Sequence, residues 1–440
     1  MDRHTSRTIP NNTERSRVPG FLVWVLVAFF CLLAGWTFAT VRSRPGDTRV
    51  YRLAAERYWK GETIYRRDDA AAFTYPPFFV LAYLPFAFMH PPWDRALWTA
   101  ANLLLAIWVA RTILVIALRS VSREKLSRKQ KAAIIGMSIL LQIRFLLSPI
   151  TYQSHEYIVL ALVVAGMVCW SWRGWLSGFF WGLAAACKAT PLLFLAVLLW
   201  RRQLWEALVF VVVAAAATFL PDWLVGDRQP GPMVLDWYET FVARVGVAAA
   251  PDVAGAWRKW NHLNQSLSGT LYRLMTPVPN EWPLRWNVAL VEVAEPLQHR
   301  IAMILKLMVL AVTLWATWRS SRTAARPTTW TALCMAATVL CGMLLLSPMS
   351  SRQHFAALAP AIAVCAVQWT TGRDQTLSSL ALACVLVFGL CGAKDIIGAA
   401  LQRQLSAYGA YTWCAVSGLA ATALAAVQSR QSSDLGLPNA

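Results

Sequence analysis

Long apolar runs dominate the pattern of this 440-residue chain, and polar positions gather in the segments between them. An apolar run of about 20 residues is long enough to form a membrane-spanning helix. The runs that meet or approach this length lie near 21–40, 76–90, 93–118, 132–148, 155–171, 176–200, 204–220, 301–318, 329–347, 353–369, 377–392 and 409–428. We therefore expect an all-α polytopic membrane protein with about twelve transmembrane helices.

The run at 76–90 is the weakest of these, because it is short and flanked by prolines, and a re-entrant segment fits it as well as a span. If it spans, the external side holds the segments 41–75, 221–300 and 348–352. The basic loops 201–203 and 319–326 then face the cytoplasm, as the positive-inside rule requires, but the basic loop 122–131 lies outside. If it does not span, loop 122–131 faces the cytoplasm, but the later basic loops face outward against the same rule. We therefore prefer the spanning alternative.

The run at 21–40 follows a polar, basic N-terminus and is longer than the apolar core of a cleaved signal peptide, which has roughly 7–15 residues. It is expected to be an uncleaved first helix that leaves the N-terminus in the cytoplasm. The expected organisation is a cytoplasmic tail at 1–20, a transmembrane domain at 21–428 with long external loops at 41–75 and 221–300, and a cytoplasmic tail at 429–440.

Composition supports this class and narrows the partners. The chain is 57% hydrophobic and 14% charged, with a mean hydropathy of +0.46, whereas a soluble domain has roughly 25% charged residues. The net charge of +19 and the 23 tryptophans fit cytoplasmic basic loops, anionic headgroups and the membrane interface, rather than nucleic acid. The cysteines lie in apolar runs, where they act as small hydrophobic side chains, and no His, Cys or Asp spacing predicts a metal site.

The segment after the first run is unusually ionic for a connector. From Thr48 to Lys60 it has helical character, with Val50, Leu53, Ala54 and Tyr58 on one predicted face. Gly61 is a plausible end of this helix. We expect an amphipathic helix that lies along the membrane interface with its arginines toward phosphate headgroups.

Asp47 stands at the entrance of that helix. One interpretation is an N-cap whose carboxylate accepts backbone N–H bonds. The other is a general base, which the neighbouring arginines would keep at a low pKa and therefore ionised. The two roles are compatible, and the same arginines are suited to hold a phosphorylated substrate.

The stretch GDTRVYRLAAERYWKGETIYRRDDAAAFTYPPF resembles the first external loop of glycosyltransferase family 87, which comprises polyprenol-phosphate-mannose-dependent mannosyltransferases and their relatives. The residues that carry the resemblance are Asp47, Tyr51, Ala54, Ala55, Gly61, Tyr65, Tyr75, Pro76 and Pro77. Three further patches agree in order: GLAAACKATPLLFLAVLLWRR (182–202), NQSLSGTLYR (264–273) and LLSPMSSRQHFAALAP (345–360). The chain departs from the family where a Gly-Gln-x-Asn patch is frequent, because His155 stands in place of the Asn.

The resemblance implies a GT-C-type glycosyltransferase fold and the inverting transfer of a hexose, mannose in the family, from a polyprenyl-phosphate sugar to an acceptor hydroxyl. Asp47 is then the base, in a site that faces the periplasm or exterior of a cell membrane. The leaving lipid phosphate needs cations more than a proton donor, and one base suits this chemistry better than the two carboxylates of a glycosidase. No cofactor is expected; the expected partners are the lipid-linked donor, a glycolipid or glycan acceptor and membrane lipids.

The residues expected to contact substrate form two groups. Lys188, Arg352 and His354 are candidates for binding phosphate, since an intramembrane charge such as Lys188 is functional by default; for Lys188 and Arg352, anchoring at the membrane interface is as plausible. Asn264 and Gln265 are candidates for hydrogen bonds to sugar, with turn formation as the alternative.

Tyr51 and Tyr75 are expected to bind substrate as part of the family pattern. The rival function is a multi-pass lipid or sugar transporter or flippase, which has a similar number of spans. The chain shows no internal repeat and concentrates its polar residues in external loops, so we favour the enzyme.

Overall fold

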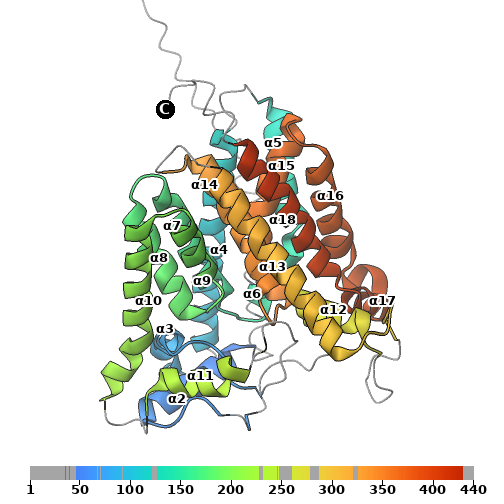
Figure 1. Ribbon diagram of the computed structural model, residues 1–440. Coiled ribbons are helices and arrows are strands. Elements are labelled where there is room, and N and C mark those ends of the chain that lie inside the picture. Colours follow the sequence, from blue (N-terminus) through green and yellow to red (C-terminus); the bar gives the residue numbers. More distant parts are fainter. Residues whose placement is uncertain are drawn as a thin grey trace, which may run out of the picture.

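The computed structural model describes residues 35, 39, 46–66, 68–69, 71–91, 93–120, 126–226, 231–244, 246, 260–277, 287–320 and 326–429. Every regular element in these ranges is a helix, and the longest helices form an upright bundle with shorter ones across its lower end (Figure 1). The predicted first span at 21–40 lies outside the described residues except for Gly35 and Ala39, as do both predicted tails except for Ser429. The prediction of an all-α membrane protein is confirmed.

Six helical segments are long and apolar enough to cross a membrane alone: α4 (Trp93–Ser120), α10 (Leu204–Val225), α13 (Glu295–Arg319), α14 (Thr329–Leu346), α18 (Ala410–Gln428) and the continuous pair of η3 (Arg352–Leu358) and α15 (Ala359–Thr371). Two bent pairs raise this number to eight: α5 (Arg128–Leu140) with α6 (Ile143–Thr151), bent by 41°, and α16 (Thr376–Cys384) and η4 (Val385–Cys391) with α17 (Lys394–Ala407), bent by 103°. Within the described residues the predicted count of about twelve spans is therefore not confirmed.

The shorter helices are α2 (Thr48–Lys60), α3 (Phe78–Ala87), α7 (Glu156–Trp170), α8 (Gly174–Cys187), α9 (Leu192–Trp200), α11 (Met233–Thr240), η2 (Val242–Arg244) and α12 (Leu267–Met275). Of these, α2, α3 and α11 lie on one side of the lower end of the molecule, and α12 lies on the other side of that end (Figure 1). The predicted external segments 41–75 and 221–300 thus contribute their described helices to the same end.

The weak run at 76–90 does not cross the bundle. Its helix α3 has 10 residues, and at a rise of 1.5 Å per residue it reaches only about 15 Å, half of the hydrocarbon core. Both of its ends stay beside the opening segment, because Tyr65 donates to the carbonyl of Tyr75 and Arg52 donates to the carbonyl of Ala87. The preferred spanning alternative is corrected accordingly.

The run at 176–200 is also not a single span. It breaks between Lys188 and Pro191, where the backbone of Lys188 is extended and the proline follows three residues later. Helix α9 then returns toward the start of α8, as the hydrogen bond from Trp170 Nε1 to Gln203 Oε1 of 2.9 Å shows. Arg201 bonds the carbonyl of Thr317 at this same end.

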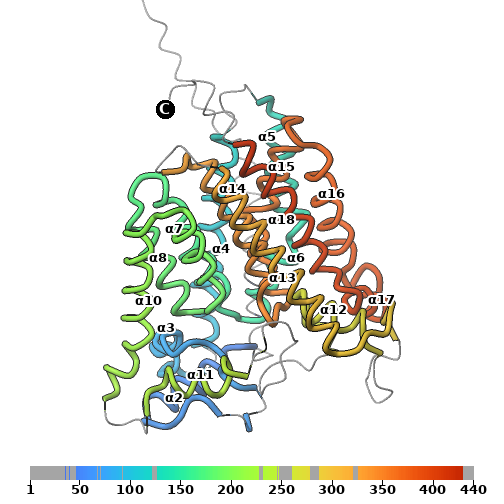
Figure 2. The backbone as a smooth tube through the Cα atoms, viewed as in Figure 1, coloured from blue at the N-terminus to red at the C-terminus, as the bar shows by residue number. Residues whose placement is uncertain are grey.

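These two corrections compensate each other in the topology. With α3 confined to the lower end, the start of α5 lies at the upper end of the bundle, the same end as the start of α10 and the end of α13 (Figures 1 and 2). Because α9 reverses the direction of the chain after α8, the helices that follow keep the directions that the twelve-span prediction gave them. The conflict with the positive-inside rule that the sequence alone left open is therefore removed.

The predicted helix after Asp47 is present with the predicted bounds, whereas its position along the membrane interface stays a prediction. Helix α2 runs from Thr48 to Lys60, and Gly61 ends it in the left-handed conformation with φ 71°. Its buried face carries Tyr51, Ala54, Ala55 and Tyr58. The predicted face was rotated by part of a turn, because Leu53 is 39% exposed.

A glycine stripe brings α8 and α10 together. Gly174, Gly178 and Gly182 are spaced four residues apart and therefore share one face of α8. A Cβ atom at Gly178 would collide with the backbone carbonyl of Glu206, and one at Gly182 would lie 2.7 Å from the carbonyl of Phe210. The small residues allow the backbones to approach each other, as in membrane helix pairs.

Candidate functional site

The opening segment is docked on the loop between α6 and α7. The N–H of Asp47 donates to the carbonyl of Tyr152 at 2.9 Å, and the Thr48 hydroxyl donates to Gln153 Oε1 at 2.6 Å. Gly46 lies so close to Tyr152 that a Cβ atom there would strike its carbonyl oxygen. Asp47 is consequently held by its backbone, which leaves its side chain available.

The Asp47 carboxylate does not cap α2. It makes no side-chain hydrogen bond to the helix N-terminus. Instead it accepts a hydrogen bond of 3.0 Å from Nε2 of Gln353, which lies in η3, 306 residues further along the chain. The N-cap interpretation is thus wrong, and the carboxylate points toward the residues that follow α14.

The surroundings of Asp47 also differ from the expected cluster of arginines. Arg52 pairs with Asp94 at 2.8 Å, and Arg57 forms two hydrogen bonds with Asp69, of 2.5 and 2.8 Å. These arginines are therefore neutralised by acids away from Asp47. Burial raises the pKa of Asp47 to about 6, although the hydrogen bond from Gln353 lowers it. The expectation of a low pKa is corrected, and a carboxyl with this pKa is a stronger base near neutral pH.

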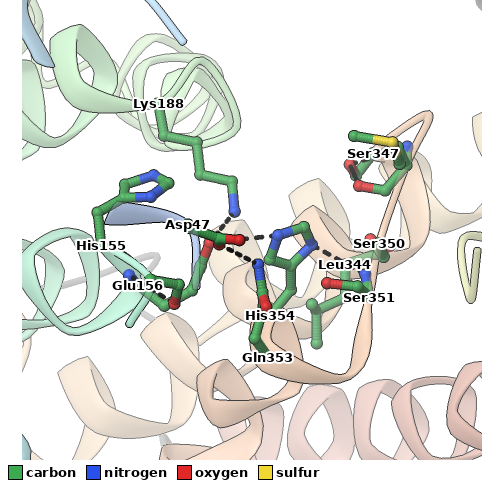
Figure 3. A network of polar contacts seen from close by, with 12 residues as sticks. Asp47, His155, Glu156, Lys188, Leu344, Ser347, Ser350, Ser351, Gln353 and His354 are labelled. Atoms are coloured by element: carbon green, nitrogen blue, oxygen red, sulfur yellow. Dashed lines mark hydrogen bonds and ion pairs between the residues drawn. The ribbon is translucent and has the colours of Figure 1, made fainter. Parts of the chain in front are cut away.

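Next to Asp47, a second carboxylate joins two of the predicted phosphate-binding residues (Figure 3). Oε1 of Glu156 lies 2.5 Å from Nζ of Lys188 and 3.3 Å from Nε2 of His354. The Ser351 N–H donates to Nδ1 of His354 at 3.0 Å, so Nδ1 is the acceptor and the neutral ring carries its proton on Nε2, facing Glu156. Lys188 and His354, 166 residues apart in sequence, are thereby held side by side.

Lys188 and His354 both line a cavity of about 410 Å³. Its other polar lining residues include Lys306 and Tyr75, and its walls include Trp237 and several aliphatic side chains. Such a cavity, with cations at one side and apolar walls elsewhere, is suited to an amphipathic molecule with an anionic group.

The structure separates Arg352 from this pair. Its guanidinium donates to Ser148 Oγ at 3.3 Å and to the Tyr152 hydroxyl at 3.0 Å, and it is not among the residues that line the cavity. Asn264 and Gln265 are almost fully buried. Asn264 binds the carbonyl of Pro348 and the N–H of Ser350, so its amide serves the backbone.

Gln265 has the same kind of environment, since its amide bonds the carbonyls of His262 and Ser406 and the N–H of Tyr411. Tyr51 and Tyr75 lie in an aromatic cluster around His155, whose Nδ1 is 3.1 Å from the Tyr51 hydroxyl. Of Asn264, Gln265, Tyr51 and Tyr75, only Tyr75 lines the cavity.

Three residues at the site were not predicted: Glu156, Lys306 and Gln353. Lys306 gives the same signal as Lys188, a lysine inside an apolar run. Glu156 stands beside His155 in the YQSHEY patch, where it is an acidic residue at the start of an apolar run. Gln353 gives no signal in the sequence, because a polar residue at a span end is common.

Comparisons with known proteins agree on one family. The model of glycosyltransferase family 87 matches residues 73–348, more than half of the chain. Two relatives are described as polyprenol-phosphate-mannose-dependent alpha-(1-2)-phosphatidylinositol mannoside mannosyltransferases. The protein from Mycolicibacterium smegmatis is 28% identical over 414 residues, covering 87% of this chain and 84% of the relative. The protein from Mycobacterium tuberculosis is 26% identical over 435 residues, covering 92% of both chains.

Among solved structures, the chain is similar to ArnT from Cupriavidus metallidurans bound to undecaprenyl phosphate. The TM-score is 0.41 at 15% sequence identity, over 92% of this chain and 77% of that one. At this level of similarity the expected GT-C architecture stays a prediction. The family match is sufficient for the central assignment: this chain belongs to glycosyltransferase family 87 and is a glycosyltransferase.

Proposed function

We propose that this glycosyltransferase transfers a mannosyl residue from a polyprenol-phosphate mannose to a hydroxyl of a phosphatidylinositol-mannoside-type glycolipid. The donor and acceptor classes are those in the names of the two relatives. The observation that carries the proposal is the position of the Asp47 carboxylate, with its raised pKa, beside the Lys188–Glu156–His354 cluster that borders the 410 Å³ cavity. The transporter alternative has no comparable support, since it gives no role to an enclosed base.

The proposed reaction assigns one task to each group. Asp47 removes the proton from the acceptor hydroxyl as its oxygen attacks the anomeric carbon. The bond from that carbon to the phosphate oxygen breaks, and the electron pair leaves with the polyprenyl phosphate. Lys188 and His354, together with Lys306, which also lines the cavity, stabilise this anion, so no proton donor is required.

A single displacement with one base implies inversion at the anomeric carbon. The second carboxylate, Glu156, is engaged with Lys188 and His354, so it is not available as a nucleophile for a two-step retaining route. We therefore propose an inverting enzyme. Placing the site on the external face is supported by the basic residues at the end of α4, the start of α5 and the end of α13, because these helix ends lie at the opposite end of the bundle (Figure 1).

The test uses the purified full-length protein in detergent with labelled polyprenol-phosphate mannose and a phosphatidylinositol mannoside. We expect covalent transfer, with a product whose anomeric configuration is opposite to that of the donor. Asp47→Asn removes the base and should lower kcat by about 10²–10⁴-fold. Transfer by the Asn variant at the wild-type rate would show that Asp47 is not the base, and a product with retained configuration would contradict the single displacement.

A further inference from the structure

One turn of η3 sends three consecutive side chains to three different partners. A 3₁₀-helix has three residues per turn, so neighbours point in directions about 120° apart. Gln353 reaches Asp47 and His354 reaches Glu156. Arg352 instead reaches Ser148 and Tyr152 on α6 and at its end. The base is thus flanked by a neutral imidazole beside the cavity and by a guanidinium that faces a separate region.

That region contains a second arginine. Arg144, Ser148 and Tyr152 are four residues apart and form one face of α6 and its C-cap. Arg352 lies across the outer part of this face, with its guanidinium 5.4 Å from the centre of the Tyr152 ring. Because Arg352 contacts Ser148, one turn from Arg144, the two guanidinium groups lie along the same stripe, and they repel each other electrostatically.

The two arginines retain unused capacity to bind an anion. Arg144 uses Nη1 for the carbonyls of Gly389 and Gly392, at 3.4 and 2.9 Å, at the corner between η4 and α17. Its Nη2 is buried and has no hydrogen-bond partner among the described residues. Within that same part of the chain, neither Arg144 nor Arg352 has a carboxylate within ion-pair distance. The outer end is accessible, because Tyr152 is 40% exposed.

We propose that Arg144 and Arg352 bind the phosphodiester of the acceptor glycolipid. This assignment rests on the proposed function and adds the acceptor subsite to it. Guanidinium groups bind phosphate oxygens through paired hydrogen bonds, and an anion between two like charges removes their repulsion. The donor phosphate is bound at Lys188 and His354, the acceptor phosphate at the arginine stripe, and Asp47 lies between them. The enzyme therefore selects anionic acceptors over neutral ones that carry the same glycan.

The experiment measures binding to the purified full-length protein in detergent, without donor. The probes are a short-chain phosphatidylinositol mannoside and the same mannoside on a neutral short-chain diacylglycerol. We expect the wild type to bind the anionic probe at least tenfold more tightly. Arg352→Gln should remove this preference: the affinity for the anionic probe should fall about tenfold or more, and the affinity for the neutral probe by less than twofold. It should also reduce the salt dependence of binding.

Matched variants separate this role from a structural one. Arg403→Gln removes an exposed arginine of α17 that donates to the carbonyl of Ala399 in the same helix, and it should behave as the wild type. Arg352→Lys keeps the charge but loses the paired hydrogen bonds, and should recover part of the affinity. Equal weakening of both probes by Arg352→Gln, or no preference in the wild type, would overturn the proposal.

A third probe, short-chain phosphatidylglycerol, distinguishes the acceptor from bulk anionic lipid. If it binds as tightly as the mannoside, the arginines form a general site for lipid phosphate and the acceptor assignment is overturned. Because binding is measured without donor, the result is independent of catalysis. A wild type that discriminates between the probes but transfers no sugar would retain the anion site and contradict the proposed function alone.

Discussion

The carboxyl group of Asp47 is enclosed by other side chains, and this burial sets the pH range in which it is ionised and can act as a base. Its pKa is raised to about 6, so kcat/KM should rise with pH through that value. Gln353→Leu removes the hydrogen bond that lowers this pKa, and the rising limb of the pH profile should move to higher pH. An unchanged limb would exclude Gln353 as a partner of the base, and Gln375→Leu, at an exposed position, is the control.

The same shift has a defined sign for stability. Because the folded-state pKa lies above its usual value of 3.8, the folded protein binds more protons in this window, and stability is lost as pH rises through about 6. Ionised Asp47 therefore opposes folding at neutral pH. Asp47→Asn should melt no lower than the wild type at pH 7.5, so its loss of activity can be assigned to chemistry. A clearly lower melting temperature would contradict this.

The pair of Lys188 and Glu156 allows charge balance to be separated from donor binding. Lys188→Met leaves Glu156 largely buried with only His354 as partner. This should lower the free energy of unfolding by about 3 kcal/mol and weaken binding of the donor. The double variant Lys188→Met with Glu156→Gln should recover stability but not donor affinity. If the double variant regains donor binding in a titration with polyprenyl phosphate, Lys188 does not contact the phosphate.

At the scale of elements, two short helical pieces decide the topology. The run at 76–90 contains a proline at position 85 and extends for only 10 helical residues, while the run at 176–200 turns back after Lys188. Both runs are apolar enough to predict a span, because hydropathy reports how apolar a segment is and not the path that it takes. The short path of α3 and the turn after α8 follow from packing against α2 and α10, which the local pattern does not encode.

The packing of α8 on α10 gives a test at this scale. Gly178→Val places atoms against the backbone carbonyl of Glu206, which cannot move independently, so the helices must separate. We expect a loss of stability of about 1–3 kcal/mol, measured by thermal unfolding in detergent. Gly136→Val in α5, where a Cβ atom meets nothing within 4 Å, is the matched control. Equal melting temperatures for the two variants would show that α8 and α10 are not in close contact.

At the scale of the molecule, the distribution of charge predicts the orientation in the membrane. In Figure 1 the start of α5 and the end of α13, with their basic residues, lie at the upper end, and α2 lies at the lower end. Lys60→Cys in α2 and Arg202→Cys in an upper loop, each in a Cys391→Ser background, should therefore react differently with a membrane-impermeant maleimide in intact cells. We expect labelling at position 60 only, and labelling at position 202 only would place the base in the cytoplasm.

The sequence by itself determined the membrane class, the bounds of α2 with its Gly61 terminus, and the family, whose model matches residues 73–348. Apolar run length, helical periodicity and a glycine terminator are local properties, so they can be found without a fold. Only the tertiary structure decided the partners: Gln353 for Asp47, Glu156 for Lys188 and His354, and α6 for Arg352.

Those pairings join residues up to 306 positions apart, and burial at the junction raises the pKa of the base. Asn264 and Gln265 illustrate the same limit, since an amide suited to a sugar is equally suited to a backbone, and packing assigned both to the backbone. The chemical nature of a side chain can be read from its own position in the sequence, but its partner and its dielectric surroundings are supplied by helices from elsewhere in the chain.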